Sequence, residues 1–134
     1  MISRDLTRKI VEVGRRILIV DDEPYIRRIL TFKLRREGYV TFEAPSAEDA
    51  EHLLGEEDVD LVLLDVALST PTNGFDLAAG LRRNARTQHL PIIMLTARGF
   101  ASDILRGREV GAVGYITKPF SAEEVVRRVQ AFLG

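Results

Sequence analysis

Short apolar runs alternate with amphipathic stretches along most of this chain. Five of the apolar runs are predicted to be strands, at residues 17–20, 39–43, 61–64, 92–95 and 113–116. Three of them are almost wholly apolar, which is expected of parallel strands that are covered on both faces. The run at 39–43 is the most polar, and it is therefore expected near an edge of the sheet. Strands that alternate with helical stretches are typical of a parallel α/β fold.

Helices are predicted between these strands because apolar residues recur there at the three- and four-residue spacing of one helical face. Their expected ranges are 24–37, 46–54, 75–81, 101–110 and 121–133. In the first helix the inward face is expected to include Ile29. In the last helix, which begins at Ser121, the inward face is expected to include Val125, Val129 and Phe132.

The length of 134 residues predicts one domain with a single sizeable core. That domain is expected to span residues 16–134, and residues 1–15 are a separate extension that forms either a short amphipathic helix or a tail. No run of the chain is long and apolar enough for a membrane span, and the N-terminus lacks the apolar core of a signal peptide. A cytoplasmic protein with no membrane partner is therefore expected.

Composition and charge exclude several classes of function. Nineteen basic and twenty acidic residues leave a net charge of −1, so direct binding to nucleic acid is not expected. Cysteine is absent, which excludes disulfides, thiolate zinc sites and cysteine nucleophiles. No glycine-rich phosphate loop follows the first predicted strand, so nucleotide binding is not expected either.

Charged and hydroxyl side chains follow the predicted strands at the points where the strands end. Asp21 and Asp22 follow the first strand, Asp65 the third and Thr96 the fourth, and Lys118 comes shortly after the fifth. Because parallel strands end on one side of a sheet, these side chains are expected to meet there. Neighbouring carboxylates raise one another's pKa unless a cation neutralises them. Oxygen ligands without His or Cys favour a hard divalent ion, so a site for Mg²⁺ or Mn²⁺ is predicted.

Each of these residues also has a simpler explanation when it is taken alone. Asp21 or Asp22 could cap the helix that begins at Pro24, Thr96 could cap the helix that follows it, and Lys118 could be a solvated loop residue. Capping, however, needs one acid for each helix start, and it does not account for a lysine at the same edge. The shared position at strand ends therefore favours one common site.

Four segments, ILIVDDEP, LVLLD, IIMLTA and GYITKPF, follow one another in a set order and spacing. In that arrangement residues 16–133 resemble the receiver domain of bacterial two-component response regulators. The resemblance implies a flavodoxin-like (βα)5 sandwich of three layers, with a parallel five-stranded sheet of order 2-1-3-4-5. It also implies a phosphoacceptor, which takes a phosphoryl group from a histidine kinase or phosphotransfer protein and then changes its protein–protein interactions.

The resemblance gives each residue of the predicted site a role. Asp65 matches the phosphoacceptor, whose carboxylate attacks the phosphoryl group to form an acyl phosphate. Asp22 matches the direct magnesium ligand, and Asp21 matches the acid that holds the ion largely through water. The main-chain carbonyl of Ala67 matches a further ligand, and Lys118 matches the lysine that pairs with a phosphoryl oxygen. Transfer is expected to be self-catalysed and Mg²⁺-dependent, with slow autodephosphorylation, so the chain is not expected to be an enzyme in the ordinary sense.

A switch between Thr96 and Tyr115 is also implied by the resemblance. The Thr96 hydroxyl is expected to move to the phosphoryl group and so to leave space into which Tyr115 turns inward. The ordinary alternative for Tyr115 is an amphipathic aromatic residue at a strand end. The bond between Lys118 and Pro119 is expected to be cis, as is common in this family.

The first departure from the family pattern is the loop after Asp65, which is one residue longer than usual. Ser69 and Pro71 lie in this loop, and the glycine at 74 comes one position late. Because the loop flanks the predicted ligand at Ala67, ion affinity or kinase docking is expected to differ from the norm. The small side chain of Ala67 is expected to leave room for an attacking water or a partner's side chain, and so to influence the lifetime of the acyl phosphate.

The second departure is at Val113 and Gly114. In many DNA-binding regulators this stretch carries acids that pair with arginines of a second subunit, and neither residue here can form such a pair. The case for a phosphorylation-dependent homodimer is weakened accordingly, although Arg127 and Arg128 remain available.

Three alternatives stand beside a stand-alone phosphoacceptor whose downstream target is another protein. The chain could be a receiver fragment of a larger regulator or hybrid kinase. It could also be a constitutive binding module on the receiver fold, but the acid pair, the acceptor and the lysine are all present and disfavour this. A magnesium-dependent phosphatase on a similar sheet is disfavoured because position 67 is alanine rather than a second aspartate.

Overall fold

The computed structural model describes residues 14–68, 72–97 and 101–134. Strands and helices alternate along these residues, as the apolar pattern predicts. The strands are β1 (Arg16–Val20), β2 (Val40–Ala44), β3 (Leu61–Asp65), β4 (Ile92–Thr96) and β5 (Gly114–Thr117). The helices are α2 (Pro24–Arg36), α3 (Ala47–Glu56), α4 (Gly74–Arg83), α5 (Ala101–Glu109) and α6 (Ala122–Leu133).

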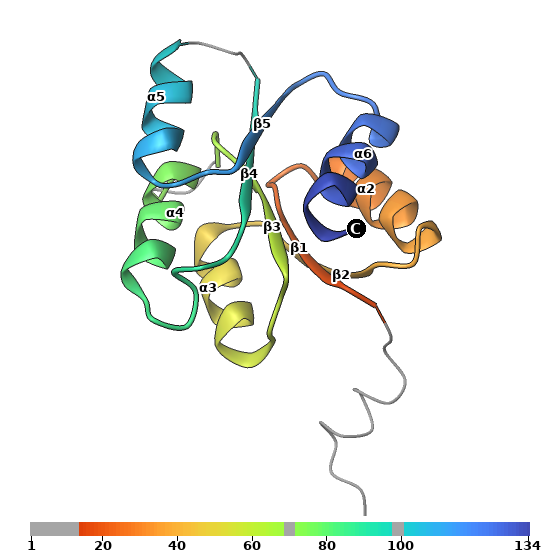
Figure 1. Ribbon diagram of the computed structural model, residues 1–134, viewed down its shortest axis with the longest axis horizontal. Coiled ribbons are helices and arrows are strands. Elements are labelled where there is room, and N and C mark those ends of the chain that lie inside the picture. Colours follow the sequence, from red (N-terminus) through yellow and green to blue (C-terminus); the bar gives the residue numbers. More distant parts are fainter. Residues whose placement is uncertain (1–13, 69–71, 98–100) are drawn as a thin grey trace, which may run out of the picture.

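The strands form one parallel sheet in the order β2-β1-β3-β4-β5. Helices α3, α4 and α5 cover one face of the sheet, and α2 and α6 cover the other, which gives three layers (Figure 1). The expected flavodoxin-like fold and strand order are therefore confirmed. The chain leaves β1 toward β2 on one side and continues at β3 on the other. In such sheets, ligands bind in the crevice outside the carboxyl ends of these strands.

The side chains of the central strands divide the core into two halves. Leu18, Leu64 and Met94 lie in the half that includes residues of α3 and α4, whereas Ile17 and Leu63 lie in the half that includes residues of α2 and α6. All five side chains are completely buried. Burial of each one stabilises the fold by about 1.5–3 kcal/mol, and burial on both faces explains why these strands are apolar throughout.

Polar caps begin three of the helices. Ser46, Asn73 and Ser121 each accept a hydrogen bond from the backbone N–H three residues further on, at 3.1, 2.9 and 3.1 Å. A cap of this kind contributes about 1 kcal/mol. Helix α2 begins differently, because Pro24 occupies its first turn and the side chain of the N-cap residue Glu23 makes no capping hydrogen bond.

The predicted element boundaries are close to those of the structure. Each strand begins and ends within one residue of its prediction, and each helix within two. The second strand lies at an edge of the sheet, as its polarity predicted. No helix in the described ranges is long and apolar enough to cross a bilayer. The predicted choice between a helix and a tail concerns the extension of residues 1–15, of which residues 1–13 lie outside the described ranges.

Two predictions about inward-facing side chains were wrong. Ile29 on α2 is 37% exposed, and Phe132 on α6 is 45% exposed. The buried face of α6 includes both Val125 and Val126. At about 100° per residue, Leu133 lies nearer than Phe132 to the centre of that face. Apolar periodicity identified α2 and α6 correctly, but it predicted a buried face on each helix that is wider than the observed one.

Candidate functional site

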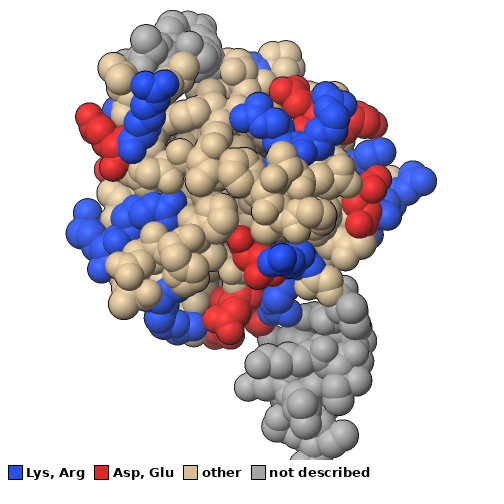
Figure 2. All heavy atoms as spheres, viewed as in Figure 1, with Lys and Arg blue, Asp and Glu red and all other residues tan. Residues whose placement is uncertain are grey.

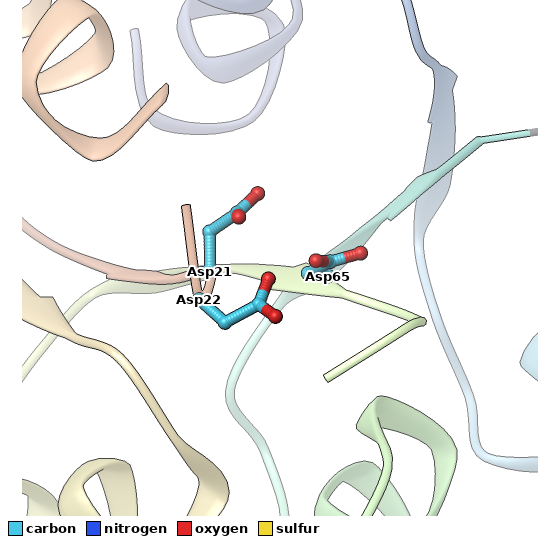
Figure 3. A group of neighbouring side chains, drawn as sticks. All are labelled: Asp21, Asp22 and Asp65. Carbon is cyan, nitrogen blue, oxygen red and sulfur yellow. The ribbon is translucent and has the colours of Figure 1, made fainter. Parts of the chain in front are cut away.

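The carboxyl ends of four strands form the candidate site. Asp21 and Asp22 follow β1, Asp65 is the last residue of β3, Thr96 is the last of β4, and Lys118 follows β5. Figure 3 shows the three aspartates gathered at this edge of the sheet. One carboxylate oxygen from each of them lies within 4.8 Å of the other two. The three acids singled out from strand ends are therefore brought together.

Asp21 is completely buried and is held by several hydrogen bonds. Its Oδ1 accepts from the N–H of Glu23 at 2.9 Å, and its Oδ2 accepts from the ammonium of Lys118 at 2.8 Å. Its own N–H donates to the carbonyl of Ala44 at 3.1 Å. Asp22 is only half-buried. Asp21 is thus fixed in place, and Asp22 is the more accessible of the two acids.

Lys118 supplies a positive charge to the site. Its Nζ lies 2.8 Å from Oδ2 of Asp21 and 3.4 Å from Oδ2 of Asp65. Burial alone would lower the pKa of this lysine, but the hydrogen bond to Asp21 and the charges of Asp65 and Asp21 outweigh it and raise the pKa. The lysine is therefore charged at neutral pH and is not a solvated loop residue. Its bond to Pro119 is cis, as expected.

The negative charge of Asp65 is disfavoured by its surroundings. The residue is 3% exposed, and burial together with the negative charge of Asp21 raises its pKa from 3.8 to about 6. Lys118 and the N–H of Ala67, which donates to Oδ1 of Asp65 at 3.0 Å, oppose this shift only in part. Three carboxylates and one ammonium leave the site with an excess of negative charge.

The donor set of this cluster fits a hard divalent cation. Each aspartate offers a carboxylate oxygen, and neither His nor Cys belongs to the group in the described part of the chain. Magnesium prefers such oxygen ligands, usually taking one or two carboxylates and keeping several waters. A cation here would also offset the repulsion from Asp21 that contributes to the raised pKa of Asp65.

The family model of the response regulator receiver domain matches residues 17–130. This chain belongs to that family. Among curated proteins, the phosphate regulon transcriptional regulatory protein PhoB of Pseudomonas aeruginosa is 46% identical over 121 residues, which cover 90% of this chain and 52% of that protein. PhoB of Escherichia coli is 42% identical over 121 residues, with the same two shares. The chain therefore spans about half the length of these relatives.

Solved structures agree with this assignment. Chemotaxis protein CheY4 of Vibrio cholerae superposes with a TM-score of 0.85 at 27% identity, over 90% of this chain and 100% of that one. The non-phosphorylated HemR receiver domain of Leptospira biflexa gives a TM-score of 0.82 at 35% identity, over 90% and 95%. The resemblance inferred from four short motifs is confirmed, and the chain is a receiver domain of two-component signalling.

After the loop that follows Asp65 in this receiver, the backbone at Gly74 lies close to the end of β3. The N–H of Val66 donates to the carbonyl of Leu95 at 2.9 Å, and the N–H of Gly74 donates to the carbonyl of Val66 at 3.0 Å. A Cβ at residue 74 would overlap the carbonyl oxygen of Asp65. Glycine is required at this position because the backbone passes too close for any side chain.

Ala67 is exposed beside the site, and its main-chain carbonyl remains a predicted ligand. Its side chain is small, and the expected room for an attacking water or a partner's side chain stays a prediction. Ser69 and Pro71, which mark the longer loop, lie outside the described residues. The predicted effect of this loop on ion affinity and kinase docking stays a prediction.

Both residues of the predicted switch contact α5. Thr96 is buried, and its hydroxyl donates to Oδ2 of Asp103 at 3.3 Å. The hydroxyl of Tyr115 donates to the carbonyls of Asp103 and Ile104 at 3.2 and 2.9 Å. Gly107 makes room for this ring, because a Cβ there would overlap the Tyr115 hydroxyl. No motif singled out Asp103 or Gly107, although both belong to the predicted fourth helix.

Arg27 also contacts the site, and no motif in the sequence predicted this. Its Nη1 donates to the carbonyl of Asp21 at 2.5 Å, and its Nε lies 3.3 Å from Oε1 of Glu43. The side chain is 15% exposed. Arg27 therefore positions the turn that carries the two acids, by tying the turn to the first part of α2 and to β2.

Proposed function

We propose that Asp65 is the phosphoacceptor of this receiver. A carboxylate oxygen of Asp65 attacks the phosphorus of a phosphohistidine on a kinase or phosphotransfer protein. The new P–O bond forms as the P–N bond breaks, and the electron pair of that bond returns to the imidazole, which takes up a proton. The carrying observation is a buried carboxylate at the end of β3 with Lys118 3.4 Å away and two further acids beside it.

Mg²⁺ or Mn²⁺ is the proposed cofactor. Asp22 and Asp65 would hold the ion directly, together with the main-chain carbonyl of Ala67. Asp21, which lies beside Lys118, would hold it largely through water. When bound, the ion supplies positive charge for the phosphoryl oxygens. The Lys118 ammonium, already close to Asp65, pairs with one of these oxygens. These groups make the transfer self-catalysed. Slow hydrolysis of the acyl phosphate then releases phosphate and restores the free carboxylate of Asp65.

Phosphorylation is proposed to act on α5 through the contacts of Thr96. Its hydroxyl binds Asp103 in the unphosphorylated chain, and a phosphoryl group on Asp65 would compete for the same donor. Asp103 also carries one of the carbonyls that hold Tyr115. Loss of the contact between Thr96 and Asp103 would therefore change the surface around α5 and Tyr115, which is where a downstream protein would read the state of the switch.

The phosphodonor protein is proposed to dock in an apolar groove next to the site. This groove has a volume of about 440 Å³ and lies between the start of α2 and the turn after β5. Its lining includes Tyr25, Ile29, Pro119 and Phe120, and Lys118 reaches the same groove. Tyr25 is 70% exposed, which leaves an aromatic ring available to a partner. A phosphohistidine presented here would be directed to the acidic cluster.

The chain spans about half the length of its curated relatives. Two kinds of downstream output are therefore proposed as alternatives. The relatives are transcriptional regulatory proteins, which favours a receiver that controls a longer cytoplasmic regulator. The similar CheY4 chain is matched over its full length, which favours a receiver that acts alone on a protein target. In both cases the receiver itself is proposed to bind protein rather than nucleic acid.

The proposal is tested with acetyl phosphate and Mg²⁺ as the phosphodonor and cofactor. Intact mass spectrometry should show a single phosphate adduct on the wild-type chain, and none on Asp65→Asn. Asp76→Asn is a matched control, because Asp76 is an exposed aspartate in the first turn of α4 and should not affect the adduct. Absence of an adduct on the wild type, or an equal adduct on Asp65→Asn, would overturn the proposal.

A further inference from the structure

A second groove follows α2 next to the edge strand β2. It has a volume of about 570 Å³ and is lined by seven residues of α2 between positions 24 and 36, together with Glu43 of β2. The residues of α2 recur three and four positions apart, so they form one continuous face. The helix has 13 residues, so the groove follows it for about 20 Å.

The charge of this groove is almost entirely positive. Four arginines line it, at positions 27, 28, 35 and 36, and the only acid in the lining is Glu43. Glu43 is already paired with Arg27. Arg28, Arg35 and Arg36 form no ion pair with any acid in the described ranges, although Arg35 donates to the hydroxyl of Thr41 at 2.8 Å. Among the residues that the structure describes, these three positive charges therefore have no counter-charge.

The helix dipole accounts for only part of this arrangement. Positive side chains in the last turn of a helix are favourable there, which covers Arg35 and Arg36. It does not cover Arg28, which lies in the first half of α2. It also does not explain why Phe32 is 64% exposed in the same groove, with the Arg36 guanidinium 5.8 Å from the centre of its ring.

One polar atom of the groove is also left unsatisfied. Thr31 lines the groove and is 8% exposed, and its hydroxyl oxygen has no hydrogen-bond partner within the described part of the chain. A buried hydroxyl without a partner costs about 1–3 kcal/mol.

These features fit a protein segment better than a nucleic acid. A duplex binder neutralises many phosphates, with Lys and Arg spread over a broad face. This chain has a net charge of −1, and on the face shown in Figure 2 positive and negative side chains are interspersed around an uncharged centre. A groove lined by four arginines and one exposed phenyl ring instead complements a segment in which carboxylates alternate with apolar side chains.

We propose that the groove between α2 and β2 binds an acidic segment of a partner protein, with carboxylates on Arg28 and Arg36 and an apolar side chain on Phe32. It lies next to the groove assigned to the phosphodonor. Arg28 is three positions from Tyr25 on α2, and Phe32 is three positions from Ile29, so the two linings share an edge. Occupation of the groove between α2 and β2 does not depend on the chemistry of Asp65. The proposal therefore stands or falls independently of the phosphoacceptor function.

The probe is a synthetic peptide of Glu residues interspersed with Leu and Phe, compared with the same peptide carrying Gln in place of Glu. Binding is followed by NMR of the ¹⁵N-labelled full chain, including the Nε–Hε signals of the arginines. The acidic peptide should shift the signals of Arg28 and Arg36 and should bind more weakly as salt is raised. The Gln peptide should bind at least about tenfold more weakly.

Variants of the chain test which arginines contribute to binding of the acidic peptide. Arg28→Gln combined with Arg36→Gln should weaken the acidic peptide at least about tenfold, because two charge-assisted contacts are lost. Arg83→Gln combined with Arg127→Gln removes the same charge from two exposed residues on other helices, and it should change binding less than about twofold. Asp65→Asn should bind the peptide as the wild type does.

Three results would overturn the proposal. The first is equal binding of the Glu and Gln peptides, and the second is an equal loss of binding in the two arginine variants. The third is tighter binding of a short DNA duplex, or of vesicles of anionic lipid, at the same arginine signals. That result would assign the groove to a polyanion of another class.

Discussion

Asp65, the proposed phosphoacceptor, illustrates how one buried acid can lower the stability of its own fold. Its folded-state pKa of about 6 lies above the ordinary value of 3.8, so as the pH rises the unfolded chain releases this proton first. The metal-free protein should therefore lose stability as the pH rises from about 4 to about 6. One pKa unit corresponds to about 1.4 kcal/mol, so the loss from this residue is at most about 3 kcal/mol.

Urea unfolding of wild type and Asp65→Asn in the presence of EDTA isolates this contribution. Asn cannot ionise, so the variant should gain stability relative to wild type as the pH rises through that window. All other titrating groups are shared by the two chains. A difference in stability that is constant from pH 4 to pH 7 would contradict the assigned environment of Asp65.

Gly107 and Tyr115 form a second pair of residues whose contact can be tested directly. Gly107→Ala introduces a Cβ where the Tyr115 hydroxyl lies, so we expect a loss of about 1–3 kcal/mol in the free energy of unfolding. In a Tyr115→Ala background the same change should cost little, because the ring is gone and alanine favours the helix. An equal cost in both backgrounds, measured as a double-mutant cycle, would show that the two residues do not compete for space.

At the residue scale, positions at strand ends predicted the three acids of the site but not the helix residues that contact the site. Asp21, Asp22 and Asp65 could be found because their backbone positions alone bring them together. Arg27 and Asp103 could not, because their contacts depend on how a helix is rotated against the sheet and on side-chain conformation. A sequence pattern records the spacing of residues and contains neither of these quantities.

At the scale of elements, Arg82 ties α4 to the segments around it. Its guanidinium donates to the carbonyls of Val110 and Gly111 at 2.9 and 3.0 Å, and to that of Gln88 at 3.0 Å. These carbonyls lie between α4 and β4 and between α5 and β5. One side chain therefore satisfies three acceptors that helix and sheet leave open.

Arg82→Met should destabilise the fold by about 2–3 kcal/mol, because it removes three hydrogen bonds from a charged donor. Arg83→Met is the matched control, since Arg83 is the exposed next residue of the same helix and should change stability by less than about 0.5 kcal/mol. Chemical denaturation of both variants measures this difference. Equal stability of the two would mean that Arg82 is not a structural link.

The helices also show where apolar periodicity stops being informative. It located α2 and α6, but it assigned Ile29 and Phe132 to buried faces that are narrower than the apolar stripe. Both residues lie at the surface, and Ile29 lines the groove assigned to the phosphodonor. The error in the core prediction at Ile29 therefore marks a surface that we propose binds protein.

At the scale of the whole molecule, alternation of strands and helices predicted the class of fold and the approximate ends of each element. It could not predict the order of the strands, because several parallel arrangements have the same alternation. The order 2-1-3-4-5 came from the resemblance carried by the four motifs, and the sheet has this order. Local pattern thus specifies the elements, while their arrangement depends on contacts distant in sequence.

The acidic cluster should also make the stability of the whole domain depend on divalent metal. The proposed Mg²⁺ site exists only in the folded chain, so Mg²⁺ should raise the unfolding temperature of the wild type, and the stabilisation should grow with the logarithm of its concentration above the dissociation constant. Asp22→Asn should abolish most of this rise, while Asp76→Asn should keep it. A rise of equal size in Asp22→Asn would place the ion elsewhere.

The central claim, that a phosphoryl group resides on Asp65, is tested most directly by reductive trapping. The chain is incubated with acetyl phosphate and Mg²⁺ and then treated with borohydride, which converts an acyl phosphate to the corresponding alcohol. Peptide mass spectrometry then identifies the modified residue. The account predicts that residue 65 alone is converted to homoserine, and only when Mg²⁺ is present. Conversion at another aspartate with residue 65 unchanged would contradict it.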